Sequence, residues 1–237
     1  MSSYDEKDLV PGLSLEAIDR SGAIGEAMED VYGHSRTAFL RKLAIGGGGL
    51  VAALAAPPLA EAKVNETGIL NFGLVFEYLQ ATFYTETQRV GTVARMDARR
   101  ARWAETLGAH ERAHVKILQS VLGKKAVAKP FFDYGGITED VEKFTRTAVA
   151  MEDLTVALLT GQLPRLQTRP LMAAFFTLLT VEARHAAWAR RIVGVRPVAG
   201  PLDHPRTLAG VAEVVRRTHF IVSRPHISAK RRPSFTG

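Results

Sequence analysis

The chain contains no cysteine. This absence excludes disulfides, iron–sulfur clusters and zinc sites built from thiolates. A transition metal in this protein must therefore be bound by histidine and carboxylate groups, a ligand set that suits iron, manganese or zinc. The rest of the composition, with 46% hydrophobic and 23% charged residues, has the balance of an ordinary globular protein. The length of 237 residues allows one or two domains.

Acidic residues are scarce beyond the N-terminal quarter of the chain. Residues 1–62 hold 5 basic and 9 acidic side chains, a formal charge of −4, whereas residues 63–237 hold 26 and 15, a charge of +11. Basic residues cluster at residues 95–102 and 230–232. No nucleic-acid-binding motif accompanies these clusters. We interpret them as a solvated helix face and a basic tail, and we expect no nucleic acid partner.

A hydrophobic run long enough to remain in a membrane is also missing. The candidate run, residues 43–56, is short and includes four consecutive glycines, whereas a membrane-spanning helix needs about 20 apolar residues. Basic residues precede this run, and Ala60-Glu61-Ala62 after it fits the small-residue pattern of a cleavage site. These features predict a signal peptide. An uncleaved anchor or a plain hydrophobic linker is the alternative.

The eight residues before this run, Ser35-Arg36-Thr37-Ala38-Phe39-Leu40-Arg41-Lys42, resemble the twin-arginine export motif. Thr37 stands where that motif has its second arginine. We therefore interpret residues 1–62 as a flexible N-terminus with an export signal. This predicts an exported protein, periplasmic or extracytoplasmic, that contacts the membrane and its export machinery only transiently.

Beyond residue 62 the apolar residues recur at helical spacing, which predicts an all-α fold. Asn65, or Thr67 as the competing choice, can cap a first helix, and Thr138 can cap a third. The four helices are expected at residues 65–90, 95–122, 138–161 and 169–193.

The segment between the second and third predicted helices has some 15 residues and spans about 50 Å if extended. It is long enough to run the length of a bundle, so we expect a four-helix bundle with a crossover between helices 2 and 3. Residues 63–195 form this bundle in the prediction. Residues 196–237 form a C-terminal extension, with a short helix from Asp203 to Arg217 and a basic tail.

Two Glu-x-x-His tetrapeptides lie in the second and fourth predicted helices. They are Glu111-Arg112-Ala113-His114 and Glu182-Ala183-Arg184-His185. With 15 glutamates and 7 histidines in 237 residues, about 0.4 such matches are expected by chance, so one match would be a weak signal. On a helix, residues three apart project from one face. Each motif therefore presents a carboxylate and an imidazole together.

Two further glutamates complete a tandem pattern. Glu77 precedes Glu111 by 34 residues, and Glu152 precedes Glu182 by 30. The order of glutamate and Glu-x-x-His thus repeats with a near-constant offset, as two helical hairpins would produce. Glu77 lies among core-type neighbours, where an unpaired carboxylate is costly to bury. Four such helices meeting in a bundle supply a ligand set for two metal ions.

Four segments carry a resemblance to a known family. They are residues 71–84, 110–114, 151–154 and 181–187, and they resemble the ferritin-like di-metal carboxylate proteins. Within that superfamily the chain is similar to exported, twin-arginine-type ferritin-like domain proteins that are related to plant desiccation proteins. The resemblance covers roughly residues 65–195.

The resemblance implies a ferritin-like bundle that binds two ions, iron or manganese, and reacts with O2 or peroxide as an oxidoreductase. The six ligands that it implies are Glu77, Glu111, His114, Glu152, Glu182 and His185. In this interpretation the glutamates of the two Glu-x-x-His motifs bridge the metals, the other two glutamates bind terminally, and each histidine binds one ion. Four carboxylates and two neutral imidazoles balance two divalent ions at zero net charge, which lowers the cost of burial.

Two other interpretations stay open. His110-Glu111-Arg112-Ala113-His114 also matches the H-E-x-x-H helix of zinc proteases, with His185 or Glu182 as the third ligand. That hypothesis leaves the second Glu-x-x-His motif unexplained. A non-catalytic stress or structural bundle that binds metal weakly is the second alternative. We expect a monomer or small oligomer and not a closed storage cage.

Aromatic residues near these motifs have two interpretations. Tyr78, Tyr84 and Trp188 can supply electrons or proton relays, but we favour ordinary core packing for all three. Asp153, which follows Glu152, is expected at the surface or in a cap.

Overall fold

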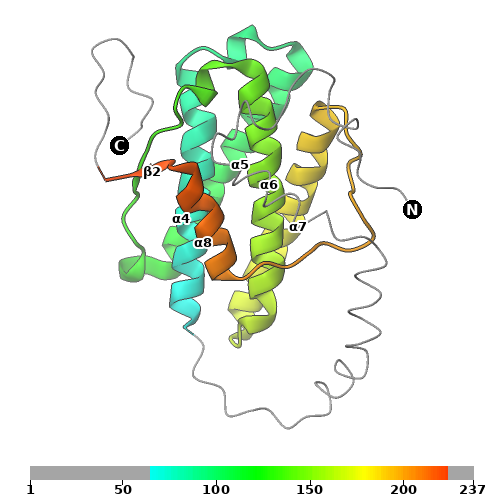
Figure 1. Cartoon of the computed structure of the whole chain (residues 1–237). Coiled ribbons are helices and arrows are strands. Elements are labelled where there is room, and N and C mark those ends of the chain that lie inside the picture. The colour runs from blue at the N-terminus through cyan, green and yellow to red at the C-terminus, as the bar shows by residue number, and fades with distance from the viewer. Residues whose placement is uncertain (1–64, 224–237) are drawn as a thin grey trace.

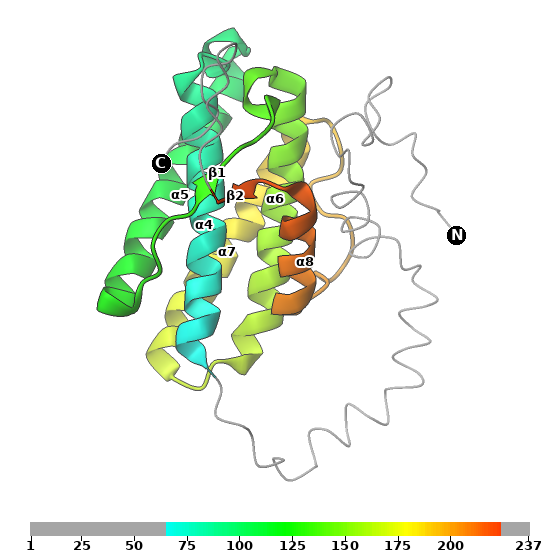
Figure 2. The ribbon, with the colours of Figure 1, turned by 60° about the vertical axis from the view of Figure 1, so that its left-hand side comes forward.

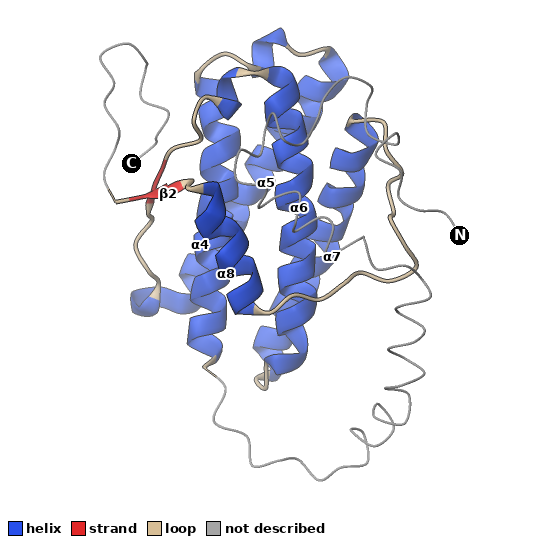
Figure 3. Cartoon of the chain, viewed as in Figure 1, coloured by secondary structure: helices blue, strands red, loops and turns tan. Residues whose placement is uncertain are grey.

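The computed structural model describes residues 65–223, and helices dominate this range (Figures 1 and 3). The helices are α4 (Glu66–Arg89), α5 (Ala98–Leu122), α6 (Val141–Gln162), α7 (Arg169–Ile192) and α8 (Leu208–Thr218). Two short strands, β1 (Phe131–Phe132) and β2 (Ile221–Val222), accompany them. The predicted export signal and basic tail lie outside the described residues. The all-α class and the four long helices are confirmed.

The first two long helices begin at side-chain caps. Asn65 caps α4 as expected, since its side-chain oxygen accepts a hydrogen bond from the Gly68 N–H at 2.9 Å. The second helix begins later than residue 95. Asp97 caps α5 by accepting bonds from the N–H groups of Arg99 and Arg100, each at 2.9 Å, and a short 3-10 turn precedes it. An aspartate at this position satisfies free amides of the first turn, which fixes the start.

The third and fifth helices also begin at other caps than the sequence predicted. Asp140, not Thr138, caps α6 by accepting from the Lys143 N–H at 2.9 Å. Thr138 lies in the preceding 3-10 turn. Thr207 caps α8 by accepting from the Gly210 N–H at 3.1 Å, so this helix starts well after Asp203. Both sites offer more than one residue whose side chain can cap a helix, and the structure uses the later one.

Helices α4 and α5 form one hairpin, and α6 and α7 form the other. The crossover between α5 and α6 passes along the bundle beside α4 (Figure 2). Its strand β1 pairs antiparallel with β2, with Phe131 opposite Val222 and Phe132 opposite Ile221. The Tyr134 hydroxyl, also on the crossover, donates to the Leu79 carbonyl of α4 at 2.8 Å. The predicted crossover is confirmed, and the strand pair that anchors it was not predicted.

The C-terminal extension packs on α6 at a glycine. The Arg206 N–H donates to the Ala157 carbonyl at 2.8 Å, and the Gln162 side chain donates to the Arg206 carbonyl at 3.1 Å. A Cβ atom at Gly161 would lie 2.0 Å from the Arg206 carbonyl oxygen. Glycine at this position therefore permits the backbone of the extension to touch the helix.

Among the helices formed by residues 65–223, none is both long enough and apolar enough to cross a lipid bilayer.

Candidate metal centre

The six residues predicted as ligands all point into the interior of the four-helix bundle. Glu77 comes from α4, Glu111 and His114 from α5, Glu152 from α6, and Glu182 and His185 from α7. Their exposed fractions lie between 0% and 6%. Each Glu-x-x-His pair projects from a single helix face, because one turn of an α-helix brings residues three apart to the same side. The four helices thus bring four carboxylates and two imidazoles into one buried cluster.

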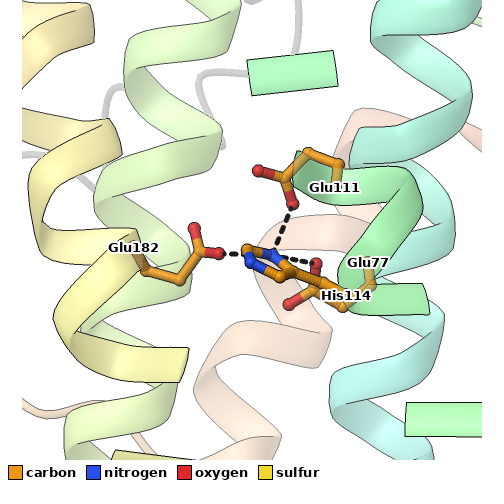
Figure 4. A group of neighbouring side chains, drawn as sticks. All are labelled: Glu77, Glu111, His114 and Glu182. Atoms are coloured by element: carbon orange, nitrogen blue, oxygen red, sulfur yellow. Dashed lines mark ion pairs between the residues drawn. The ribbon is translucent and has the colours of Figure 1, made fainter. Parts of the chain in front are cut away.

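One half of the cluster surrounds the imidazole of His114 (Figure 4). Its Nδ1 atom lies 2.8 Å from Glu182 Oε1, 3.4 Å from Glu77 Oε2 and 3.5 Å from Glu111 Oε2. These three carboxylates come from three different helices. The arrangement can hold one cation between a nitrogen and three oxygens.

The other half surrounds His185. Its Nδ1 atom lies 3.0 Å from Glu111 Oε1, 3.4 Å from Glu182 Oε2 and 3.6 Å from Glu152 Oε2. Glu111 and Glu182 therefore each turn one oxygen to His114 and the other to His185. Two neighbouring groups of potential ligands therefore share two carboxylates, which fits the arrangement that the sequence resemblance implied.

Eight buried atoms of this cluster have no hydrogen-bond partner among the described residues. They are Glu77 Oε2, both oxygens of Glu111 and of Glu182, Glu152 Oε2, and the Nδ1 atoms of His114 and His185. His114 Nδ1 and Glu182 Oε1 lie only 2.8 Å apart, but their relative orientation does not form a hydrogen bond. A buried polar atom without a partner costs about 1–3 kcal/mol, and more when it is charged. Cations at the two positions would satisfy all eight atoms, so the residues fit a pair of metal ions.

Burial and mutual interaction shift the pKa values of the cluster. Burial and the neighbouring glutamates raise the pKa of Glu111 well above its usual range, and burial raises the pKa of Glu152 to about 7. Burial lowers the pKa of the two histidines, but the surrounding carboxylates outweigh it. They raise the pKa of His185 to about 12 and also raise the pKa of His114. Without a metal the cluster keeps protons on its imidazoles, and an entering cation displaces them.

Two residues outside the predicted set contact the ligands. The Tyr84 hydroxyl donates to Glu152 Oε1 at 2.6 Å, and the His110 Nδ1 atom lies 2.9 Å from His185 Nε2. Tyr84 is buried against Trp103 and Phe144 at ring-centroid distances of 6.1 and 5.5 Å. Its place seven residues, or almost two turns, beyond Glu77 on the same helix gave a weak signal. The place of His110, one position off the face of the ligands, follows from its helix, but its contact joins residues 75 positions apart, so no local pattern identifies His185 as its partner.

Three other residues with predicted positions lie outside the cluster of six ligands. Asp153 was expected at the surface, but it is buried and forms a two-bond ion pair with Arg190, at 2.8 Å to Nε and 2.6 Å to Nη2. Burial of Arg190 inside the α6–α7 pair requires this carboxylate, which explains the difference. Tyr78 accepts from the Gln119 side chain at 2.8 Å and borders the crossover. Trp188 packs against the core as favoured.

The zinc-protease hypothesis requires His110 and His114 to bind the same ion. Of the described residues, His110 joins neither group of potential ligands. It meets the outer nitrogen of His185, on the side away from the carboxylates. The helix face of His114 is instead shared with Glu111, and the second Glu-x-x-His motif completes the cluster. The geometry therefore does not provide the two-histidine zinc site.

A comparison with family models agrees with the bundle and its cluster. The model of the family described as "Ferritin-like domain" matches residues 65–195, which is more than half of the chain. The matched range contains all four long helices and all six residues of the cluster. No curated protein matches the chain.

Proposed function

Because the chain belongs to the ferritin-like domain family, we propose that it binds two divalent ions, iron or manganese, in the cluster of six residues. We propose further that the loaded protein is an oxidoreductase that reacts with O2 or peroxide, in oxidative-stress defence or metal handling. The family and the buried cluster support metal binding.

The sharing of Glu111 and Glu182 between the two histidines carries the proposal. Both oxygens of each glutamate are buried, face different imidazoles and lack hydrogen-bond partners within residues 65–223. A single ion would leave one oxygen of each glutamate unsatisfied. Two divalent ions would balance four carboxylate charges while the imidazoles stay neutral. The geometry therefore favours a pair of ions over a single one.

Each residue of the cluster has a distinct role in this proposal. Glu111 and Glu182 would hold both ions, His114 and Glu77 would complete one position, and His185 and Glu152 would complete the other. When bound, the ions would supply redox chemistry with O2 or peroxide. Oxygen ligands of this hardness suit iron and manganese.

The residues around the cluster exclude water from one side of it and orient the side chain of Glu152. The Tyr84 hydroxyl donates to Glu152 Oε1 and so leaves Oε2 turned toward His185. Burial and the charge of Glu152 raise the pKa of Tyr84 well above its usual range, so the phenol keeps its proton. Trp103 and Phe144, both fully buried, pack beside Tyr84 and exclude water from this side.

We also propose that the protein is exported and related to the desiccation-type proteins. The support is the pattern of residues 35–62 in the sequence, with its basic flank, short apolar run and small-residue site. Sequencing the N-terminus of the mature protein, after expression in a host with a twin-arginine pathway, tests the proposal. A new N-terminus near residue 63 in the extracytoplasmic fraction supports it, and full-length protein confined to the cytoplasm contradicts it.

Metal stoichiometry tests the proposed centre. The protein is loaded with Fe²⁺ or Mn²⁺ without oxygen, freed of excess metal and analysed for metal and protein. We expect two ions per chain, none after the double change Glu111→Gln with Glu182→Gln, and one after Glu77→Gln. Fewer than two ions in the parent protein would contradict the proposal.

A buried glutamate on α4, the helix of Glu77, provides the matched control for Glu77→Gln. Glu86 is fully buried and pairs with Arg89 at 2.6 Å, away from the cluster. Glu86→Gln should keep both ions although it disturbs a buried carboxylate in the same way. Oxygen uptake by the iron-loaded parent then tests the reaction separately, because two tightly bound ions without any O2 or peroxide turnover would favour the non-catalytic bundle.

A further inference from the structure

We propose that His110 is a positioning residue that holds the imidazole of His185 and makes the two metal positions unequal in affinity. The inference rests on the proposed two-ion centre and deepens it. His110 lies on α5, one residue before Glu111, but it is exposed and does not face the carboxylates.

The two histidines meet through the nitrogens that do not face the cluster. His110 Nδ1 lies 2.9 Å from His185 Nε2, and the two rings are stacked with centroids 5.1 Å apart and an angle of 21°. On the opposite side of the His185 ring, Nδ1 lies 3.0 Å from Glu111 Oε1. Both nitrogens of His185 are therefore engaged, one by the cluster and one by His110.

Metal binding at Nδ1 determines which nitrogen of His185 carries a proton, and the contact with His110 accommodates that form. A ligand nitrogen must be free of hydrogen, so Nδ1 is unprotonated in the loaded form and Nε2 carries the proton. The Nε2–H group then donates to the Nδ1 lone pair of His110. Hydrogen bonds of this kind fix the tautomer and ring orientation of a metal-binding histidine and raise its basicity. His110 thus prepares His185 for its ion.

The other metal position lacks such a residue. Within residues 65–223, no side chain forms a hydrogen bond with the outer nitrogen of His114. The sequence shows the same asymmetry, since the residue that precedes the glutamate of the second motif is Val181, which has no polar side-chain atom. The two motifs therefore differ in the residue that precedes the glutamate. The His185 position should bind its ion more tightly than it would without His110, and the His114 position receives no such support.

Two substitutions separate the hydrogen bond from the bulk of the side chain. His110→Phe keeps a ring at this exposed place and removes the acceptor. His110→Asn keeps an acceptor, because the asparagine amide oxygen can stand where Nδ1 of the histidine stands. Each is made in a His114→Ala background, which isolates the His185 position, and in a His185→Ala background, which isolates the other.

Co²⁺ titration without oxygen measures the affinities, with absorption spectroscopy and a competing chelator as readouts. In the His114→Ala background, His110→Phe should weaken Co²⁺ binding by about 10- to 100-fold, the usual cost of losing such a partner. His110→Asn should stay within about threefold of its parent. In the His185→Ala background both substitutions should change the affinity by less than about threefold. Circular dichroism of the metal-free variants verifies that the bundle is intact.

The outcomes distinguish this inference from the proposed function. Equal weakening in both backgrounds, or none in the His114→Ala background, would overturn the role of His110 while the two-ion centre stands. Failure of the unsubstituted protein to take up two Co²⁺ ions would overturn the proposed function itself.

Discussion

Raising the pH should destabilise the metal-free protein, because its buried imidazoles keep protons that the unfolded chain releases. The pKa of His185 is raised from an ordinary 6.5 to about 12 in the folded chain. A group whose pKa is raised by folding stabilises the fold at low pH, and this contribution decreases as the pH rises from the unfolded toward the folded pKa. For His185 this decrease runs from pH 6.5 to about pH 12, so it is under way throughout the range from pH 7 to pH 9.

The expected size follows from proton linkage. One proton held by the folded but not the unfolded chain changes the free energy of unfolding by about 1.4 kcal/mol per pH unit, so His185 alone should lower it by about 2–3 kcal/mol between pH 7 and pH 9. For a chain of this size that corresponds to a fall of roughly 5–10 °C in the melting temperature. The pKa of His114 is raised as well, so its contribution has the same sign. Glu152, with a pKa of about 7, acts mainly below this range.

Thermal unfolding of chelator-treated protein at pH 7, 8 and 9, followed by circular dichroism, measures this slope. His185→Gln is the comparison, since it removes one titrating imidazole and should flatten the slope by about 1.4 kcal/mol per pH unit. Loading with Mn²⁺ should displace the protons, so added metal should stabilise the protein more at pH 8.5 than at pH 7. A metal-free melting temperature that is constant or rises from pH 7 to pH 9 would refute the electrostatic argument.

Two further predictions concern contacts that α6 makes outside the cluster. Gly161→Ala should lower the free energy of unfolding by about 1–3 kcal/mol, because the new Cβ atom would lie 2.0 Å from the Arg206 carbonyl oxygen and disturb two hydrogen bonds. Gly73→Ala is its control, since the nearest atom lies 3.9 Å away, and urea unfolding should show it to be neutral or more stable by up to about 1 kcal/mol. Asp153→Ala should cost about 3–5 kcal/mol by leaving Arg190 buried without its carboxylate. The same variant should still bind two ions per chain by elemental analysis, and loss of both ions in a folded variant would place Asp153 in the centre.

Much of the candidate centre was predictable because its pattern is local. The helical period and the spacing of three residues in each Glu-x-x-His motif determine that a carboxylate and an imidazole share a helix face. The offset between the two hairpins then selects Glu77 and Glu152 as their companions. Such relations depend on the geometry of a single helix and on the order of helices, both of which the sequence contains.

Helix starts were less predictable, because neighbouring residues compete for the same role. Thr138 and Asp140 both have side chains that cap helices, and the structure uses Asp140. Strands β1 and β2 have two residues each, too short for a period to be recognised. Their pairing depends on where the crossover and the C-terminal extension come together.

By itself, the sequence determined an all-α bundle, its crossover, and six residues that can meet in its interior. Only the tertiary structure decided that Glu111 and Glu182 each turn one oxygen to each histidine, that Asp153 is buried with Arg190, and that His110 contacts His185. Those contacts join side chains on different helices. They depend on how each helix is rotated and displaced against its neighbours, and this is settled by packing of the whole core, not by any local spacing.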